Sequence, residues 1–459
     1  MSGQSFLGDM LQTITERGRQ LLSLGPTQEQ PARKKRLSLE QLCENLLGGR
    51  GEASGMALAS HVLDRWAGLS PDDKLAFMTM LLKRFGVDET RLAAAVEAWR
   101  AAPSHETARI LHEAAEPRRQ ELIRRLNLAP GGVGALVRMR AELLDMLRRH
   151  PELSPVDADF AHLFGSWFNR GFLILKPIDW TTPANVLEKI IRYEAVHEIG
   201  DWDELRRRVE PEDRRCFAFF HPRLADEPLI FVEVALTTTM ASTIDELLDG
   251  VRAPIRARDA TAAVFYSISN CQEGLRGVSF GNFLIKQVVA DLKAELPELA
   301  TFVTLSPVPG FAAWLDDRRS AGDLDPDDLA ALALLDRQDW ADDEQAAEAL
   351  RPVLARQTAR FLLSAKNAHG FPLDPVARFH LGNGARLERV NPLGDRSRRG
   401  LRGAHGMMVN YLYELSEIET NHETFFGKGE IAASGSVRRL ARPAGKTGSG
   451  PDPKNEKAA

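Results

Sequence analysis

The stretch that decides the fold of the second half of the chain is residues 263–294, AVFYSISNCQEGLRGVSFGNFLIKQVVADLKA. It begins with a short apolar run rich in Val, Phe, Tyr and Ile, which is typical of a buried strand. Glycines at 274, 277 and 281 mark a turn, and an amphipathic run from Asn282 to Ala294 predicts a helix. A strand, a glycine-bearing turn and a helix in this order predict a mixed α/β domain around the segment.

The turn itself has the features of an anion site. Backbone N–H groups at the start of a helix are unpaired and lie at its positive end, where they can bind phosphate oxygens. The glycines permit close backbone approach, and Arg276 adds a cation at the rim. The segment lacks the Gly-Lys-Ser/Thr of a P-loop and the glycine spacing of a dinucleotide fold. It therefore predicts a pyrophosphate site, with an ordinary βα turn as the alternative.

Other short apolar runs extend the predicted sheet on both sides of this segment. They lie at residues 216–220, 229–236, 302–305, 387–390 and 407–412. Between the strands predicted at 302–305 and 387–390, the cap Asp325-Pro326 opens a helical insertion that we place near 325–369. This half of the chain, residues 169–435, is thus expected to be one α/β domain.

The first half has a different periodicity. Apolar residues recur at helical spacing from Leu37 to Phe168, and Ser38 with Gln41 and Ser70 before Pro71 are helix start signals. We therefore expect an all-α helical bundle over 37–168. Residues 1–36 are interpreted as an N-terminal segment and a polar linker, which holds Pro26, Pro31 and the basic run 33–36. Residues 436–459 are interpreted as a disordered tail, because they have too little apolar content to fold.

Composition excludes several classes of protein. The chain has 459 residues, 44% of them hydrophobic and 27% charged, which is ordinary for a folded globular protein. The formal net charge of −5 gives no reason to expect nucleic acid as a partner. The three cysteines are widely separated, and no apolar run is long enough to cross a bilayer. We expect a cytoplasmic protein with no metal site and no membrane partner.

Two residues outside the turn could take part in chemistry. Ser306 stands at the end of a predicted strand, because Pro307 cannot donate the next ladder hydrogen bond. His380 lies in the last turn of a short helix that should begin at Asp374-Pro375, where the helix dipole favours the imidazolium form. The pattern suggests a proton donor at His380, with an exposed or capping histidine as the alternative.

Longer strings carry a resemblance to a known family. They are IRYEAVH (191–197), FHP (220–222), FYSIS (265–269), GNFLIK (281–286), LSPVPGF (305–311), RFHL (378–381) and MVNY (408–411). In this order they are similar to strings of the malonyl-CoA decarboxylases. The string RGVSFG (276–281) also resembles the coenzyme A pyrophosphate loop of the GNAT acyltransferase superfamily, from which Ser279 departs.

The resemblance implies an α+β protein, with an N-terminal helical oligomerisation domain and a C-terminal GNAT-like catalytic domain. It implies that Ser306 hydrogen-bonds the malonyl carboxylate and accepts or relays a proton, that His380 is the proton donor and that Tyr411 supports them. The residues implied to bind malonyl-CoA, besides Ser306 and His380, are Arg276, Gly277, Val278, Ser279, Phe280, Gly281 and Asn282. The resemblance also implies a homotetramer.

The expected activity is the conversion of malonyl-CoA to acetyl-CoA and CO2 through a thioester enolate that a histidine protonates. Because the thioester itself accepts the electrons, no cofactor is expected. Two other functions stay open. A GNAT-type N-acyltransferase would explain the loop but not the segments around Ser306 and His380. A non-enzymatic helical interaction protein, with the C-terminal domain as a ligand sensor, would explain neither.

Overall fold

A computed structural model describes residues 37–49, 51–278 and 284–442 of the chain. Contacts divide the chain into two compact units. The first holds the residues up to Leu175 together with the segments Phe219–Ile230 and Asn270–Gly281, and the second holds the rest. The glycine-bearing turn therefore belongs to the same unit as the helical region. The predicted segment 1–36 lies outside the described residues.

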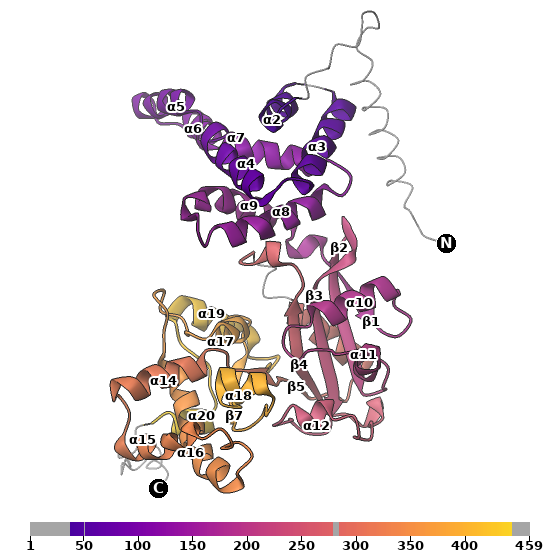
Figure 1. Cartoon of the computed structure of the whole chain (residues 1–459), viewed down its shortest axis with the longest axis vertical. Helices are drawn as coiled ribbons and strands as arrows, with labels where there is room; N and C mark the ends of the chain where they lie inside the picture. The colour runs from indigo at the N-terminus through magenta and orange to yellow at the C-terminus, as the bar shows by residue number, and fades with distance from the viewer. Residues whose placement is uncertain (1–36, 50, 279–283, 443–459) are drawn as a thin grey trace, which may run out of the picture. The chain divides into compact units, whose positions relative to one another are not determined.

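The helical region contains no strand in the described residues between Leu39 and Trp167, as the apolar spacing predicts (Figure 1). Ser38 and Gln41 form the expected reciprocal capping box, and the Ser70 side chain accepts the N–H of Asp73. Its helices are α2 (Leu39–Leu47), α3 (Glu52–Ala67), α4 (Pro71–Arg84), α5 (Glu89–Ala101), α6 (His105–Ala115), α7 (Arg118–Leu126), α8 (Gly132–Met146) and α9 (Ser154–Trp167).

The strands of the described residues form an eight-stranded mixed sheet in the order β1-β2-β3-β4-β5-β8-β6, with β7 paired to β8. Strand β4 is parallel to β5, whereas β8 is antiparallel to β5, β6 and β7. This confirms the predicted mixed α/β domain. The strands are β1 (Ile174–Ile178), β2 (Arg214–His221), β3 (Leu224–Thr237), β4 (Ala262–Asn270), β5 (Thr301–Thr304), β6 (Ser306–Pro307), β7 (Arg386–Asn391) and β8 (Met408–Leu412).

Strand β1 was not predicted from the sequence. Only Ile178 of its five residues is buried, so the strand lacks the apolar alternation that marks a half-buried strand. Its sequence, ILKPI, also contains a proline, which lowers the strand signal further.

The helices of the second unit accompany this sheet. They are α10 (Ala184–Tyr193), α11 (Trp202–Val209), α12 (Asp245–Leu248), α13 (Leu284–Glu295), α14 (Phe311–Ala321), α15 (Pro326–Leu332), α16 (Glu344–Ser364), α17 (Pro375–Gly382), α18 (Arg398–Ala404), α19 (Ile418–Lys428) and α20 (Gly435–Leu440). Helices α15 and α16 supply the predicted helical insertion. None of the described helices is both long and apolar enough to span a bilayer.

The predicted disordered tail from residue 436 is wrong at its start, because helix α20 extends to Leu440. Ser434 caps the helix by accepting the N–H of Val437, and the Val437 side chain is fully buried. Ser434 also donates to the carbonyls of Leu387 and Glu388 of β7, so contacts with distant residues order this short helix although its composition is polar. Residues 443–459 lie outside the described residues.

A buried apolar cluster connects the middle of the sheet to helix α12. It includes Val264 of β4, Val303 of β5, Met408 of β8 and Leu247 of α12, together with Leu305. Leu305 lies between β5 and β6, and its amide donates to the carbonyl of Phe265 at 2.9 Å. This packing holds the chain rigidly at the residue that precedes Ser306.

Candidate active site

Ser306 lies at the start of the two-residue strand β6, which pairs with β8 through Ser306 opposite Val409. Its side chain is buried, and its hydroxyl donates to Thr304 Oγ1 at 2.9 Å. The same Thr304 oxygen accepts the N–H of Tyr411 at 3.1 Å. The pairing with β8 therefore continues at Ser306 and Pro307, slightly beyond the strand end that the proline predicts.

His380 lies in the last turn of α17, as predicted. Asp374 caps this helix by accepting the N–H of Ala377, Pro375 is its first residue and Asn383 is its C-cap. The imidazole Nε2 lies 3.3 Å from Ser306 Oγ, although the two residues are 74 positions apart in the chain. The structure thus brings together the two residues that the sequence analysis paired.

The expected imidazolium form of His380 is wrong. The ring is 3% exposed, and burial lowers the pKa of His380 to about 3. The helix dipole cannot reverse this effect, because the His380 carbonyl already accepts the amides of Asn383 and Ala385. The desolvation cost of a buried charge exceeds the small gain from a helix end. His380 is therefore a neutral imidazole at neutral pH.

A second tyrosine that the sequence analysis did not select contacts this ring. Tyr413 Oη lies 2.8 Å from His380 Nδ1. Tyr411 stacks on the imidazole instead, with ring centroids 4.7 Å apart, and its buried hydroxyl has no hydrogen-bond partner among the described residues. The described hydrogen bond to His380 Nδ1 thus comes from Tyr413, whereas Tyr411 contacts the ring by stacking. The two-residue spacing of a strand could have indicated it, because residues i and i+2 lie on one face.

The hydrogen bonds around His380 run in one direction, from the Tyr413 hydroxyl through the imidazole to Ser306 and on to Thr304. Because Ser306 donates its hydrogen to Thr304, Ser306 Oγ is free to accept from Nε2–H of the ring. In a neutral imidazole the other nitrogen, Nδ1, then accepts the hydrogen of Tyr413. Burial raises the pKa of Tyr413, so its hydroxyl keeps its proton and can donate it to Nδ1. The arrangement places a proton on Nε2, facing Ser306.

The glycine-bearing turn follows β4 as a 3₁₀ turn at Glu273–Leu275. A Cβ on Gly274 would meet the Val137 carbonyl of α8 at 1.8 Å, so only glycine allows this approach. Gly277 has φ +78°, which also favours glycine. Two of the three glycines singled out in the sequence, Gly274 and Gly277, are therefore required by the backbone. The exposed Arg276 side chain lies 3.5 Å from the Glu273 carboxylate.

A buried arginine holds this turn in place. Arg140 of α8 is 3% exposed, and its Nη1 donates to the carbonyls of Gly274 at 2.8 Å and Arg276 at 2.9 Å. Its Nε donates to Asp157 of α9 at 2.7 Å. Two helices of the first unit therefore fix the backbone of the turn. Arg140 was not predicted from the sequence, because its partners in the turn lie more than 130 positions away.

The expectation that the turn presents free amides is wrong for part of it. The N–H groups of Leu275, Arg276 and Val278 donate to carbonyls within the turn, at 2.9–3.0 Å. A 3₁₀ turn satisfies its own amides in this way. The amides of Arg276 and Val278 are thus committed in this structure. Of the other residues expected to bind malonyl-CoA, Ser279, Phe280, Gly281 and Asn282 lie outside the described residues.

Three other histidines, His197, His221 and His405, are buried or partly buried and belong to neither candidate site. His221 Nδ1 accepts the N–H of Arg223 at 3.1 Å, and burial lowers the pKa of His197 to about 4. The pKa of His405 is also lowered by burial. Across the ranges 37–49, 51–278 and 284–442, no group of three or more His, Cys, Asp and Glu side chains is placed to hold a metal ion.

Comparison with known proteins identifies the family. Residues 171–449 match the malonyl-CoA decarboxylase C-terminal domain, and residues 85–168 match its N-terminal domain. The mitochondrial malonyl-CoA decarboxylase of Anser anser anser is 37% identical over 349 residues, covering 70% of this chain and 69% of that protein. The Rattus norvegicus enzyme is 36% identical over 358 residues, covering 72% of each.

Solved structures agree. The crystal structure of malonyl-CoA decarboxylase from Rhodopseudomonas palustris is 60% identical with a TM-score of 0.84, and covers 87% of this chain and 98% of that one. That from Agrobacterium vitis is 58% identical with a TM-score of 0.85, and covers 88% of this chain and 100% of that one. The chain therefore belongs to the malonyl-CoA decarboxylase family.

Proposed function

We propose that this chain converts malonyl-CoA to acetyl-CoA and CO2 with Ser306 and His380 as its catalytic residues. The carboxy-lyase activity rests on family membership. The assignment of the residues rests on one observation, the 3.3 Å contact between Ser306 Oγ and His380 Nε2 in a buried setting.

Loss of CO2 breaks the bond between the α-carbon and the carboxylate and leaves the electron pair on the α-carbon. The thioester carbonyl delocalises this pair as an enolate, so the reaction needs no separate electron acceptor. In our proposal the Ser306 hydroxyl hydrogen-bonds the malonyl carboxylate, exchanging its present partner Thr304 for the substrate. A buried setting favours the reaction, because the charge of the carboxylate is better solvated in water than in the site.

His380 then delivers a proton to the α-carbon. The proton is the one on Nε2, which Tyr413 keeps there by donating to Nδ1. A neutral imidazole can serve as this acid because the carbanion that receives the proton is strongly basic, and proton transfer by a positioned group is worth ~10² to 10⁴-fold in rate. Solvent returns the proton to the ring before the next turnover.

The turn that carries Arg276, Gly277 and Val278 is proposed to bind the diphosphate of malonyl-CoA, with Ser279, Phe280, Gly281 and Asn282 continuing the contact. The exposed Arg276 guanidinium can donate to a phosphate oxygen. A homotetramer formed by the helical region is a proposal on the same family relation. A cytoplasmic location is a proposal from the sequence, in which the three cysteines are widely separated and form no paired spacing.

The test is release of CO2 and acetyl-CoA from malonyl-CoA by the full chain, with and without added divalent metal, and with no amine present. Ser306→Ala and His380→Gln should each lower kcat by at least ~100-fold while coenzyme A binding changes little. The exposed His369 provides the control His369→Gln, which should keep the wild-type rate. Wild-type kcat in either site variant would show that the residue is misassigned, and turnover only with an amine would favour an N-acyltransferase.

A further inference from the structure

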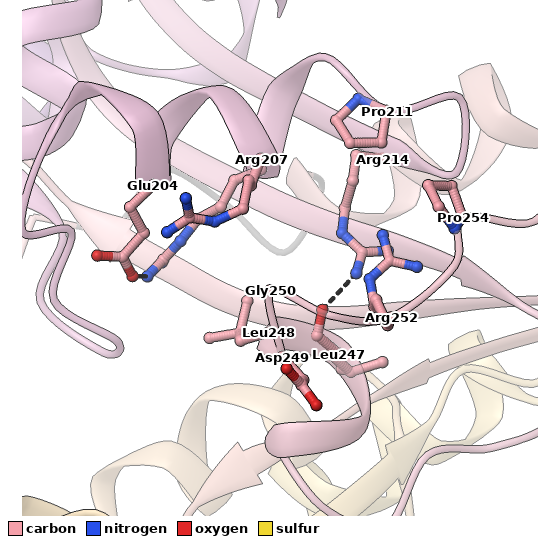
Figure 2. A pocket seen from close by; sticks show the side chains of 11 residues that line it. Glu204, Arg207, Pro211, Arg214, Leu247, Leu248, Asp249, Gly250, Arg252 and Pro254 are labelled. Atoms are coloured by element: carbon pink, nitrogen blue, oxygen red, sulfur yellow. Dashed lines mark hydrogen bonds and ion pairs between the residues drawn. The ribbon is translucent and has the colours of Figure 1, made fainter.

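A pocket of about 120 Å³ lies in the second unit, lined by side chains of α11, of the start of β2, of α12 and of the segment that follows α12 (Figure 2). Four arginines dominate its wall. The lining residues are Glu204, Arg207, Arg208, Pro211, Arg214, Leu247, Leu248, Asp249, Gly250, Arg252 and Pro254. The space exceeds what one water molecule needs. None of these residues belongs to the proposed catalytic group.

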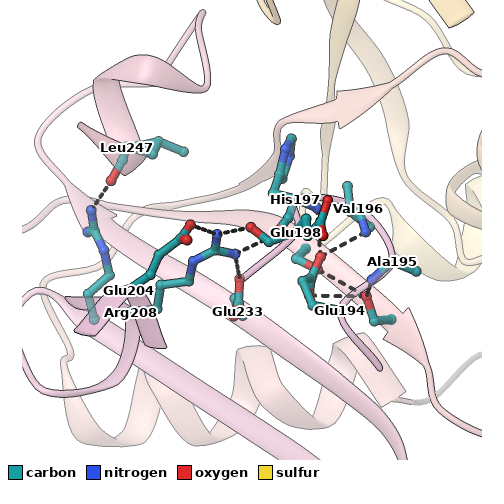
Figure 3. Close-up of polar contacts among 12 residues, drawn as sticks. Glu194, Ala195, Val196, His197, Glu198, Glu204, Arg208, Glu233 and Leu247 are labelled. Carbon is teal, nitrogen blue, oxygen red and sulfur yellow. Dashed lines mark hydrogen bonds and ion pairs between the residues drawn. The ribbon is translucent and has the colours of Figure 1, made fainter. Parts of the chain in front are cut away.

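Arg208 is already neutralised. Its Nη atoms donate to Glu204 at 2.5 Å and to Glu233 at 3.3 Å, and to the carbonyls of His197 and Glu198 (Figure 3). Burial raises the pKa of Glu233 to about 8, and the Glu204 carboxylate, at 2.5 Å against 3.3 Å, is the nearer counter-charge of Arg208. The other Glu204 carboxylate oxygen accepts the amide of Gly200 at 2.8 Å. This arginine therefore contributes no net charge to the pocket.

Arg214 and Arg252 share a single carboxylate. Arg252 takes both oxygens of Asp213, at 2.6 and 2.8 Å. Arg214 is 3% exposed and lies 3.6 Å from the same carboxylate, and it donates to the carbonyls of Asp213 and Leu247. Desolvation, followed by repulsion from Arg252, lowers the pKa of Arg214. Two guanidinium groups facing one carboxylate leave one positive charge uncompensated.

Arg207 adds a second positive charge. It is exposed and makes no hydrogen bond or ion pair with any residue that the structure describes. Gly250 lies beside it, where a Cβ would be 3.8 Å from Arg207 Nε, so the absence of a side chain leaves the guanidinium open. The remaining acid, Asp249, is directed away from the guanidinium groups (Figure 2) and accepts the amide of Val251.

We propose that this pocket binds a small phosphate-bearing anion, a phosphate monoester or free phosphate, through Arg207, Arg214 and Arg252. Two uncompensated guanidinium groups match the charge of a phosphate dianion, and guanidinium groups on several sides suit its tetrahedral oxygens. The site is separate from the turn proposed for malonyl-CoA, because its residues are all different. It does not rest on the proposed function.

Binding here should stabilise the core that precedes Ser306. The Leu247 carbonyl accepts Arg214, and the Leu247 side chain belongs to the buried cluster that contains Leu305 and Met408. An anion that holds Arg214 also holds α12 against this cluster. We therefore expect a ligand-dependent rise in the thermal midpoint of the full chain.

The experiment titrates inorganic phosphate into the full-length protein at constant ionic strength, with binding followed by calorimetry and by the thermal midpoint. Arg207→Gln should weaken phosphate binding by at least ~10-fold, because it removes one charge-assisted contact. Arg206→Gln is the matched control, because Arg206 directly precedes Arg207 in α11 but does not line the pocket. Its exposed side chain is paired with Glu210. This control should bind phosphate like the wild type.

A third variant, Arg276→Gln, distinguishes the two anion sites. It should leave phosphate binding unchanged, and Arg207→Gln should keep the wild-type thermal midpoint without phosphate, which shows that it is folded. The proposal is overturned if Arg207→Gln and Arg206→Gln bind phosphate equally. It is also overturned if Arg276→Gln alone abolishes binding, or if sodium chloride at the same ionic strength stabilises the protein as much as phosphate.

Discussion

His380 shows how burial decides the chemistry of a single side chain. Its position at a helix end favours a charged ring, but burial away from water favours a neutral one. The backbone carbonyl of His380 already accepts two amides, which weakens the effect of the helix end. A neutral ring has a donor and an acceptor nitrogen, so its neighbours decide which nitrogen carries the proton. The hydroxyls of Ser306 and Tyr413 make that choice here.

The role of Tyr413 can be tested against that of Tyr411. Tyr413→Phe removes the donor to His380 Nδ1 and allows the proton to move away from Nε2, so we expect kcat to fall ~10 to 100-fold with KM nearly unchanged. Steady-state kinetics with malonyl-CoA measure both constants.

Tyr411→Phe is the control for this prediction. It removes a hydroxyl that has no hydrogen-bond partner in the described structure but keeps the ring that stacks on His380. Its kcat should stay within ~3-fold of the wild type, since no hydrogen bond is lost. A larger loss in Tyr411→Phe than in Tyr413→Phe would contradict the assigned proton position.

At the scale of elements, the turn after β4 depends on helices that precede it by more than 100 residues. Gly274 allows the backbone to touch α8, and Arg140 ties two carbonyls of the turn to the Asp157 side chain of α9. A buried guanidinium with several acceptors is a rigid connection, because each lost contact leaves a buried polar group unsatisfied. The helical region therefore positions a segment proposed to bind substrate.

Arg140→Gln tests this connection. We expect the variant to raise KM for malonyl-CoA by at least ~10-fold with a smaller change in kcat, because the turn contacts the diphosphate rather than the reacting carbon. The measurement is steady-state kinetics together with coenzyme A binding by calorimetry.

The matched control is Arg119→Gln. Arg119 is also buried in the helical region, and it pairs with the buried Asp159, but it does not contact the turn. It should lower the free energy of unfolding about as much as Arg140→Gln without raising KM. Equal KM values in the two variants would mean that the loss is general destabilisation and that Arg140 has no positioning role.

At the scale of the whole molecule, buried histidines make stability depend on pH. Burial lowers the pKa of His380 to about 3 and that of His197 to about 4, whereas an unfolded histidine titrates near 6.5. As the pH falls, the unfolded state therefore binds protons first. The contribution of these neutral histidines to the free energy of unfolding is complete above pH 6.5 and is lost as the pH falls below it. Buried Glu233 and Asp374 have raised pKa values and act in the opposite direction over part of this range.

A comparison of variants separates these effects. Between pH 7 and pH 5, protonation of His197 in the unfolded state should lower the unfolding free energy of the wild type by about 2 kcal/mol. His197→Gln should not show this decrease. The carboxyl contributions cancel in the difference between the two proteins. Denaturant unfolding at both pH values measures it, with the exposed His369→Gln as control. A difference that stays constant with pH would show that His197 titrates normally in the folded protein.

Much of the architecture could be predicted locally. The caps at Ser38 and Ser70, the helix from Pro375 and the strand before the glycine turn all depend on residues a few positions apart. Strand β1 escaped prediction because it is mostly exposed and is ordered by pairing with β2, and helix α20 because its order comes from contacts with distant residues rather than from its own apolar pattern. Ser306 and His380 were singled out at a strand end and a helix end, but their pairing came from the family resemblance, and no spacing in the chain shows that they meet.

The sequence by itself determined the helical first half, the mixed α/β second half and the candidate pair Ser306 and His380, because periodicity, caps and motif strings are written in neighbouring residues. Only the tertiary structure decided the contact between that pair, the neutral state of its imidazole and the hydrogen bond from Tyr413 to that ring. It also decided the connection through Arg140 and the surplus of guanidinium groups around Arg207. These properties depend on which distant side chains share a buried space, and desolvation and hydrogen bonding there are set by the folded neighbours.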